Sequence, residues 1–163
     1  MLCRTEHPFS ENVRAKIAQF CNVESEAVIQ ALDVQDVYEV PLMFSQQNLD
    51  RIILRLLELP SGKEDLKAWR TQVVERALHP RTTARIAVVG KYIKLQDAYK
   101  SIYEALRHGG LANDTKVEVK RVDAAQLTKA DAATHLGDVQ GILVPGGFGY
   151  RGIEGKLEAI RFA

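Results

Sequence analysis

The sequence has few cysteines, no long apolar run and no excess of either charge. Its 163 residues include two cysteines, Cys3 and Cys21, which cannot form a disulfide framework and fit a reducing, cytoplasmic compartment. The 22 basic and 21 acidic residues give a net charge of +1, which argues against nucleic acid or an anionic membrane as a partner. No apolar run approaches the ~20 residues that a membrane-spanning helix needs.

Sequence signatures of several common sites are also missing. The four histidines are scattered without ligand spacing, so we expect no metal site. No Walker A loop is present, because Gly90-Lys91 is followed by tyrosine and Gly155-Lys156 by leucine. No serine, threonine or cysteine stands in a recognisable nucleophile context.

The most informative stretch is the glycine-rich segment Gly141–Gly155, with the sequence GILVPGGFGYRGIEG. Its apolar start predicts a buried parallel strand, and Pro145-Gly146-Gly147 ends that strand. The segment from Glu154 to Ala163 is predicted to be a helix. A strand, a glycine turn and a helix bring unpaired backbone N–H groups together, which favours binding of an anion.

Three interpretations of this loop remain open on these grounds. The string from Gly147 to Gly152 matches the dinucleotide pattern GxGxxG, although that pattern usually follows the first strand of its fold. Alternatively, the backbone N–H groups of Gly146, Gly147 and Phe148 form an oxyanion hole for an acyl-transfer reaction. The third interpretation is a structural turn that binds nothing.

The second half of the chain alternates strand and helix patterns. Predicted strands cover 86–90, 116–122 and 141–144. Predicted helices begin at Asp97, span 124–136, and span 154–163, with Gly109-Gly110 ending the first of them. This order predicts the first half of a doubly wound α/β sheet, flavodoxin-like in type.

The first half is predicted to be the end of a domain. A helix begins after Ser10 and stops at Asn22, a short helix covers Ser25–Ala31, and an extended segment runs from Asp33 to Val40. Another helix covers Asn48–Leu59, with Asn48 as its cap or in a left-handed turn before it. A polar break and a helix at Leu66–Leu78 then form a linker. The predicted divisions are residues 1–60, 61–84 and 85–163.

Several motifs now resemble the CTP synthase family across nearly the whole chain. They are LCRT at 2–5, RAKIAQFCNV at 14–23, ALDVQDVYEVP at 31–41, VGKYIKLQDAYKS at 89–101, EALRHGGL at 104–111 and GILVPGGFGYRGIEGK at 141–156. The order and spacing of these motifs make the resemblance specific. It implies that residues 1–60 end a synthetase domain of P-loop type, and that residues 85–163 begin a class I glutamine amidotransferase domain.

The resemblance also implies an activity and partners. The synthetase domain would use ATP with Mg to phosphorylate UTP, and the glutaminase domain would release ammonia from glutamine. Ammonia would then displace the phosphate to give CTP, with GTP as an activator and no organic cofactor. Homotetramers and filaments are implied as assemblies.

Matching positions carry site roles from the family. For the nucleotides, the candidates are Lys16 at UTP or CTP, and Arg4, Asp33, Val34 and Phe20 around ATP. For glutamine they are Gly147, with Phe148 as oxyanion support. The GTP-linked lid would contain Phe148, Arg151, Gly152 and Glu154. The face between the domains would contain Lys91, Tyr92 and Lys100.

The P-loop and the nucleophilic cysteine of the family are missing from this sequence. A glutaminase without its cysteine cannot form a thioester, so we expect an internal piece of such an enzyme that is inactive alone. One alternative is a non-catalytic nucleotide-binding or assembly module of this length. A flavodoxin-like regulatory domain is a third interpretation, but no acidic cluster or flavin loop supports it.

Overall fold

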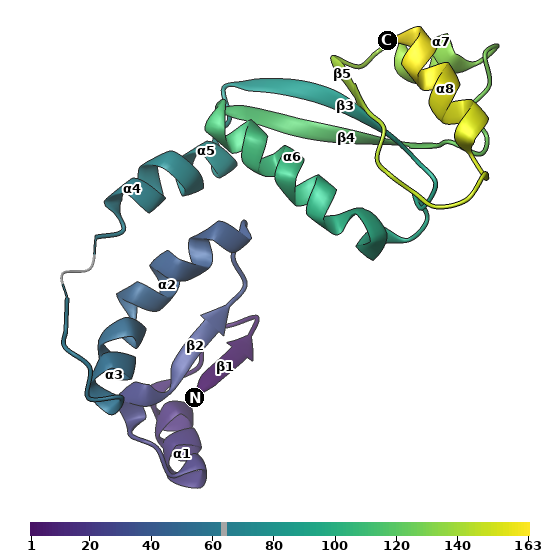
Figure 1. The fold of residues 1–163 in the computed structure, drawn as a ribbon. Coiled ribbons are helices and arrows are strands. Elements are labelled where there is room, and N and C mark those ends of the chain that lie inside the picture. The colour runs from purple at the N-terminus through teal and green to yellow at the C-terminus, as the bar shows by residue number, and fades with distance from the viewer. Residues whose placement is uncertain (63–64) are drawn as a thin grey trace. The chain divides into compact units, whose positions relative to one another are not determined.

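The structure is a computed structural model that describes residues 1–62 and 65–163. The chain forms two compact units, Met1–Leu78 and His79–Ala163 (Figure 1). The architecture is mixed α/β, with a parallel sheet in each unit. This confirms the α/β prediction. Among the described residues, no helix combines the length and apolar character needed to cross a membrane.

The first unit begins with two parallel strands joined by a helix. Strands β1 (Leu2–Thr5) and β2 (Ile29–Leu32) pair, and α1 (Glu11–Cys21) connects them. The predicted cap and stop of this helix are confirmed. The side chain of Ser10 accepts the N–H of Val13, and Asn22 ends the helix in the left-handed conformation.

Two predictions for the next segment are wrong. In place of a helix over Ser25–Ala31, the 3-10 turn η1 (Ser25–Ala27) leads into β2, because Val28 and Ile29 are buried and β-branched residues favour strands. In place of an extended segment over 33–40, η2 (Val37–Glu39) leads into α2 (Val40–Gln46). A capping box between Asp36 and Glu39 starts this turn, and Pro41 occupies the first turn of α2.

Helix α3 (Leu49–Leu56) completes the core of this unit. Asn48 precedes it with φ 57°, which confirms the left-handed alternative. Ile52 packs with Ala27 and Ile29 in the core, together with the partly buried Phe44 and Leu49.

The helix predicted over Leu66–Leu78 is confirmed, as α4 (Lys67–Trp69), a π-helical turn η3 (Arg70–Val74) and α5 (Glu75–Leu78) in succession. The indole N–H of Trp69 donates to the carbonyl of Tyr38 at 2.8 Å, and the two rings meet edge to face. These contacts tie the helix to the first unit.

The second unit is a three-stranded parallel sheet in the order β4-β3-β5. Its strands are β3 (Thr82–Gly90), β4 (Thr115–Asp123) and β5 (Gly141–Leu143). The 3-10 turn η4 (Gln96–Tyr99) and helix α6 (Lys100–Ala112) follow β3, α7 (Ala132–Leu136) follows β4, and α8 (Ile153–Phe162) follows β5. From β3 the chain moves to one side of the sheet to form β4, and from β4 it crosses β3 to form β5 on the other side. With right-handed crossovers, this change of direction places α6 on one face of the sheet and α7 and α8 on the other (Figure 1).

The helix boundaries of this unit correct three predictions. Asp97 lies inside η4 and does not cap a helix. Gly109 and Gly110 lie inside α6, which ends at Ala112. The cap residue Asn113 donates its N–H to the carbonyls of both glycines. The predicted helix over 124–136 is reduced to α7, because Asp123 and Asp131 cap local turns before it.

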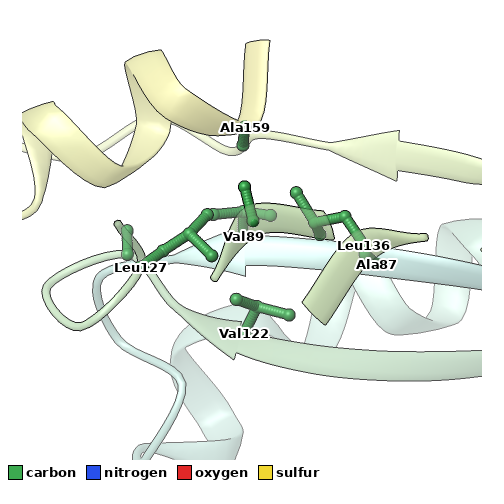
Figure 2. Packing of buried hydrophobic residues seen from close by; sticks show 8 residues of the cluster. Ala87, Val89, Val122, Leu127, Leu136 and Ala159 are labelled. Carbon is green, nitrogen blue, oxygen red and sulfur yellow. The ribbon is translucent and has the colours of Figure 1, made fainter. Parts of the chain in front are cut away.

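The core of the second unit lies between the sheet and the α7–α8 face. Figure 2 shows Ala159 of α8 above Val89 of β3, with Leu136 of α7 and Val122 of β4 around them. Ala159 and Val89 are fully buried. Gly155 allows this close packing, because a Cβ there would lie 2.0 Å from the carbonyl oxygen of Ala124.

Candidate functional site

The glycine-rich loop lies at the carboxyl end of β5, next to the carboxyl end of β3. Its residues follow Pro145, which is buried, and they are exposed from Gly146 to Arg151. Gly149 and Gly152 have φ of 74° and 79°, a conformation that favours glycine. Gly152 is also the residue immediately before α8. The loop therefore needs glycine at these two positions to turn into the helix.

Two lysine side chains hold carbonyl groups of this loop. The ammonium of Lys156 donates to the carbonyl of Pro145 at 2.7 Å, and the ammonium of Lys91 donates to the carbonyl of Phe148. Gly147 lies between them, since a Cβ there would be 3.4 Å from Lys156 Nζ and 3.7 Å from Lys91 Cδ. The loop carbonyls are therefore turned toward the two lysines.

The N–H groups of the same loop are available for a ligand. Within residues 1–62 and 65–163, no acceptor contacts the N–H of Gly146, Gly147 or Phe148. Phe148 itself is 91% exposed, so its side chain is not packed in the core. Free N–H groups beside two ammonium groups create a site that favours negative charge. This geometry suits an oxyanion, as one of the three sequence interpretations required.

The lid candidates differ in how they are held. Arg151 donates from its guanidinium to the carbonyl of Lys91 at 3.1 Å, which links the glycine loop to the loop after β3 a second time. Gly152 packs against Ala124, whose Cβ would be 3.3 Å from a Cβ at Gly152. Glu154 is exposed in the first turn of α8.

The candidates Lys91, Tyr92 and Lys100 lie around the turn that follows β3. Lys91 and Tyr92 are half-buried, and the ammonium of Lys91 lies 5.7 Å from the centre of the Tyr92 ring. Lys100 is exposed as the first residue of α6. Lys91 thus contributes to the glycine-loop site in this unit.

Sequence reasoning placed 97–101 at the face between domains, but it did not predict the contacts by which two residues organise this site. Lys156 lies one helical turn beyond Gly152, and Tyr99 contacts the backbone of Lys91 and Tyr92 through its hydroxyl. The spacing of Lys156 from the loop could have suggested its contact. No periodic signal points to Tyr99, because its contact depends on how η4 folds back on β3.

In the first unit, the structure brings Arg4, Asp33 and Val34 together at the carboxyl ends of the paired strands β1 and β2. The guanidinium of Arg4 forms an ion pair with Asp33 and also donates to the carbonyl of Ala31 at 3.3 Å. Both charged side chains are more than half exposed, and Val34 is half-buried. Open α/β sheets bind ligands at this edge.

Lys16 and Phe20 are on α1, one turn apart, and both are exposed; Phe20 is 88% exposed. Because α1 returns the chain toward the amino end of β2, Phe20 in its last turn lies toward the opposite end of the strands from Arg4. In the described part of the chain, no hydrogen bond or ion pair joins either residue to the Arg4–Asp33 pair.

The clearest pKa shifts of the second unit lie away from the glycine loop. Lys120, and then Arg85, lower the pKa of Asp138 below its usual value by hydrogen bonds of 2.6 and 2.7 Å. Asp138 in turn raises the pKa of Arg85. In the part of the chain that the structure describes, no hydrogen bond or ion pair joins these three side chains to the glycine loop. Their shifts therefore reflect a surface ion-pair network rather than the candidate site.

Both cysteines are in the first unit, Cys3 in β1 and Cys21 at the end of α1. The second unit, which holds the glycine loop, has no thiol of its own. The loop can thus stabilise an anion, but this unit supplies no cysteine nucleophile to generate one.

Two family descriptions match the two halves of the chain. Residues 1–59 match the CTP synthase N-terminus, and residues 94–163 match class I glutamine amidotransferases. The CTP synthase of Granulibacter bethesdensis is 51% identical over all of this chain, and that of Streptococcus pyogenes serotype M18 is 47% identical over the same span. The chain covers 30% of the length of each. In both matched parts, and over its whole length, this chain is similar to CTP synthases.

Proposed function

We propose that this chain serves in the ATP-dependent amination of UTP to CTP, with glutamine or ammonia as the nitrogen donor. The observation that carries the proposal is the glycine loop, where the N–H groups of Gly147 and Phe148 are free while neighbouring carbonyls are held by lysines. An acyl transfer from glutamine develops negative charge on the amide oxygen, and such N–H groups stabilise it. The relatives named CTP synthase support the same reaction.

In this proposal the second unit binds glutamine through Gly147 and supports the oxyanion with Phe148. The lysines supply positive charge and hold the loop in shape before substrate arrives. Phe148, Arg151, Gly152 and Glu154 belong to a lid whose position GTP would influence. Lys91, Tyr92 and Lys100 are candidates for the face that couples glutamine hydrolysis to amination.

The first unit would bind nucleotides. Arg4 offers a cation for ATP at the strand ends, and Asp33 and Val34 offer an edge for the adenine ring. Lys16 would contact UTP or the product CTP. Phe20 is kept as a proposed wall residue of the ATP region on the family resemblance alone, because it lies toward the other end of the strands from Arg4. We propose residues 1–60 as the end of a P-loop-type synthetase domain, 61–84 as a linker and 85–163 as the start of the glutaminase domain.

Two parts of this chemistry are not supplied by the chain. The sequence has no Walker A loop for the ATP phosphates, and its second unit has no cysteine. Among the described residues, no three His, Cys, Asp or Glu side chains gather at one place, and we propose that the Mg ligands lie outside this chain. We propose that the 163-residue chain alone makes no CTP, and that the complete protein acts as a homotetramer able to form filaments.

The test uses the natural gene product that contains this chain. CTP formation from UTP and ATP is measured with glutamine and, separately, with ammonia. We expect Gly147→Ala to reduce the glutamine-dependent rate at least tenfold, because the added methyl group enters the oxyanion site, and to leave the ammonia-dependent rate unchanged. Gly62→Ala is the control, since nothing lies within 4 Å of a Cβ there.

The same experiment distinguishes the enzyme from the alternative, a non-catalytic nucleotide-binding or assembly module. A parent protein that binds ATP or UTP but forms no CTP with either nitrogen donor would favour a nucleotide-binding or assembly module. Equal loss of both rates in Gly147→Ala would place Gly147 outside the glutaminase site.

A further inference from the structure

A buried tyrosine holds the corner where β3 ends. Tyr99, the last residue of η4, is 4% exposed, and its hydroxyl accepts the N–H of Lys91 at 3.0 Å and that of Tyr92 at 3.3 Å. Its ring fills the space beside Gly90, where a Cβ would lie 2.4 Å from ring atom Cε2. Gly90 and Tyr99 are therefore fitted to each other, and together they set the path of the backbone after β3.

This corner is connected to the glycine loop through Lys91. The Lys91 ammonium donates to the carbonyl of Phe148, and the Lys91 carbonyl accepts from Arg151 at 3.1 Å. A Cβ at Gly149 would also lie 3.4 Å from Lys91 Nζ. A shift of the Lys91 backbone would therefore move the peptide groups on both sides of the exposed Phe148.

We propose that Tyr99 is a positioning residue for glutamine hydrolysis. Its hydroxyl fixes the backbone of Lys91, and Lys91 fixes the loop that presents the N–H groups of Gly147 and Phe148. Donors stabilise a developing oxyanion best when they are in place before the charge forms. The inference rests on the proposed glutaminase function and adds to it a residue that does not touch the substrate.

The hydroxyl and the ring of Tyr99 can be tested separately. The ring packs near Tyr92 and Tyr103, with centres 6.1 and 6.4 Å away, and Tyr99→Phe retains that packing. Tyr103→Phe is a matched control. In the part of the chain that the structure describes, the buried Tyr103 hydroxyl has no hydrogen-bond partner, and the ring alone meets Arg121.

The first experiment measures glutamine hydrolysis by the natural gene product. We expect Tyr99→Phe to lower kcat about tenfold with little change in KM for glutamine, because alignment of the loop is lost and substrate contacts are not. Ammonia-dependent CTP formation should keep its parental rate. Tyr103→Phe should match the parent in both assays. Parental kcat in Tyr99→Phe, or equal loss with glutamine and ammonia, would overturn the inference.

A second readout does not depend on catalysis. Phe148 and Tyr150 are 91% and 90% exposed and are chymotrypsin sites. We expect cleavage after these residues, located by mass spectrometry, to be several-fold faster in Tyr99→Phe than in Tyr103→Phe. A lower kcat without faster cleavage would show that the effect does not act through the loop, and it would also overturn the inference.

The two experiments together distinguish failure of this inference from failure of the proposed function. If the parent hydrolyses no glutamine, the proposed function fails and the catalytic role of Tyr99 fails with it. Faster cleavage in Tyr99→Phe would then still show that the hydroxyl holds the loop.

Discussion

Arg151 donates a hydrogen bond to the backbone carbonyl of Lys91 across 60 residues of sequence, at 3.1 Å. The Lys91 ammonium returns a bond to the carbonyl of Phe148, three residues before Arg151. Two residues from different loops thus hold each other's segments at the carboxyl edge of one sheet. The geometry of the glycine loop therefore depends on this reciprocal contact as well as on its glycines.

Replacing Lys91 should weaken glutamine use. We expect Lys91→Met to reduce glutamine-dependent CTP formation about tenfold or more, because a hydrogen bond from a charged donor contributes about 1.5–3 kcal/mol. The measurement is the glutamine-dependent rate beside the ammonia-dependent rate. Lys94→Met, an exposed lysine of the same loop, is the control. If the two variants behave alike, the Phe148 contact has no role in the reaction.

Two adjacent glycines of α6 should respond oppositely to alanine. A Cβ at Gly109 meets nothing within 4 Å, whereas one at Gly110 would lie 2.4 Å from the carbonyl oxygen of Thr115. Gly109→Ala should stabilise the unit by about 0.5–1 kcal/mol through helix propensity. Gly110→Ala should destabilise it by about 1–3 kcal/mol through overpacking. Thermal unfolding of the natural gene product, followed by circular dichroism, measures both, and a shift of equal sign would contradict the packing described.

Acid should remove the contribution that Asp138 makes to the stability of the folded state. Lys120, then Arg85, hold the pKa of Asp138 below its usual value of 3.8. The folded state therefore binds this proton less readily than the unfolded chain. The contribution is present above about pH 4 and is lost as pH falls through the folded-state pKa.

An NMR titration of the Asp138 carboxyl carbon tests this directly. We expect Lys120→Met to raise the pKa of Asp138 toward 3.8, while Lys116→Met leaves it unchanged. Lys116 pairs with Glu118 at 3.6 Å and is a matched lysine of the same strand. An unaltered titration in Lys120→Met would mean that Arg85 alone sets the shift.

Arg4 should affect ATP in both modes of CTP synthesis. We expect Arg4→Met to raise KM for ATP about tenfold with either nitrogen donor, since a lost charge-assisted contact costs about 1.5–3 kcal/mol. Arg51→Met, an exposed arginine of α3 in the same unit, should have no effect. A change confined to the glutamine-dependent rate would argue against Arg4 at the ATP site.

In the second unit, sequence patterns predicted the strands better than the helix ends. Apolar runs located β3 and β5, and alternation located β4, because burial on a sheet imposes these patterns directly. Gly109-Gly110 was misread as a helix end, since the sequence does not show that Gly110 packs against Thr115. The segment after Leu32 was also misread, although the Asp36–Glu39 capping box and Pro41 were visible signals of a helix start.

The candidate site was predictable in part for the same reason. Gly147 and its neighbours were found because a glycine turn after a buried strand has a recognisable composition. The contributions of Tyr99 and Lys156 were not, because they depend on tertiary contacts between segments that no local pattern links.

The unequal pairing of β3 has a consequence for the order of folding. β3 pairs with β4 over nine residues but with β5 over only three, from Ile86↔Gly141 to Val88↔Leu143. The β5 pairing also closes the longer loop of chain, which costs more entropy. We therefore expect β3, α6 and β4 to form the nucleus and β5 to dock last. The Gly147–Phe148 peptide, which follows β5 in the chain, would then reach its final conformation only at the end of folding.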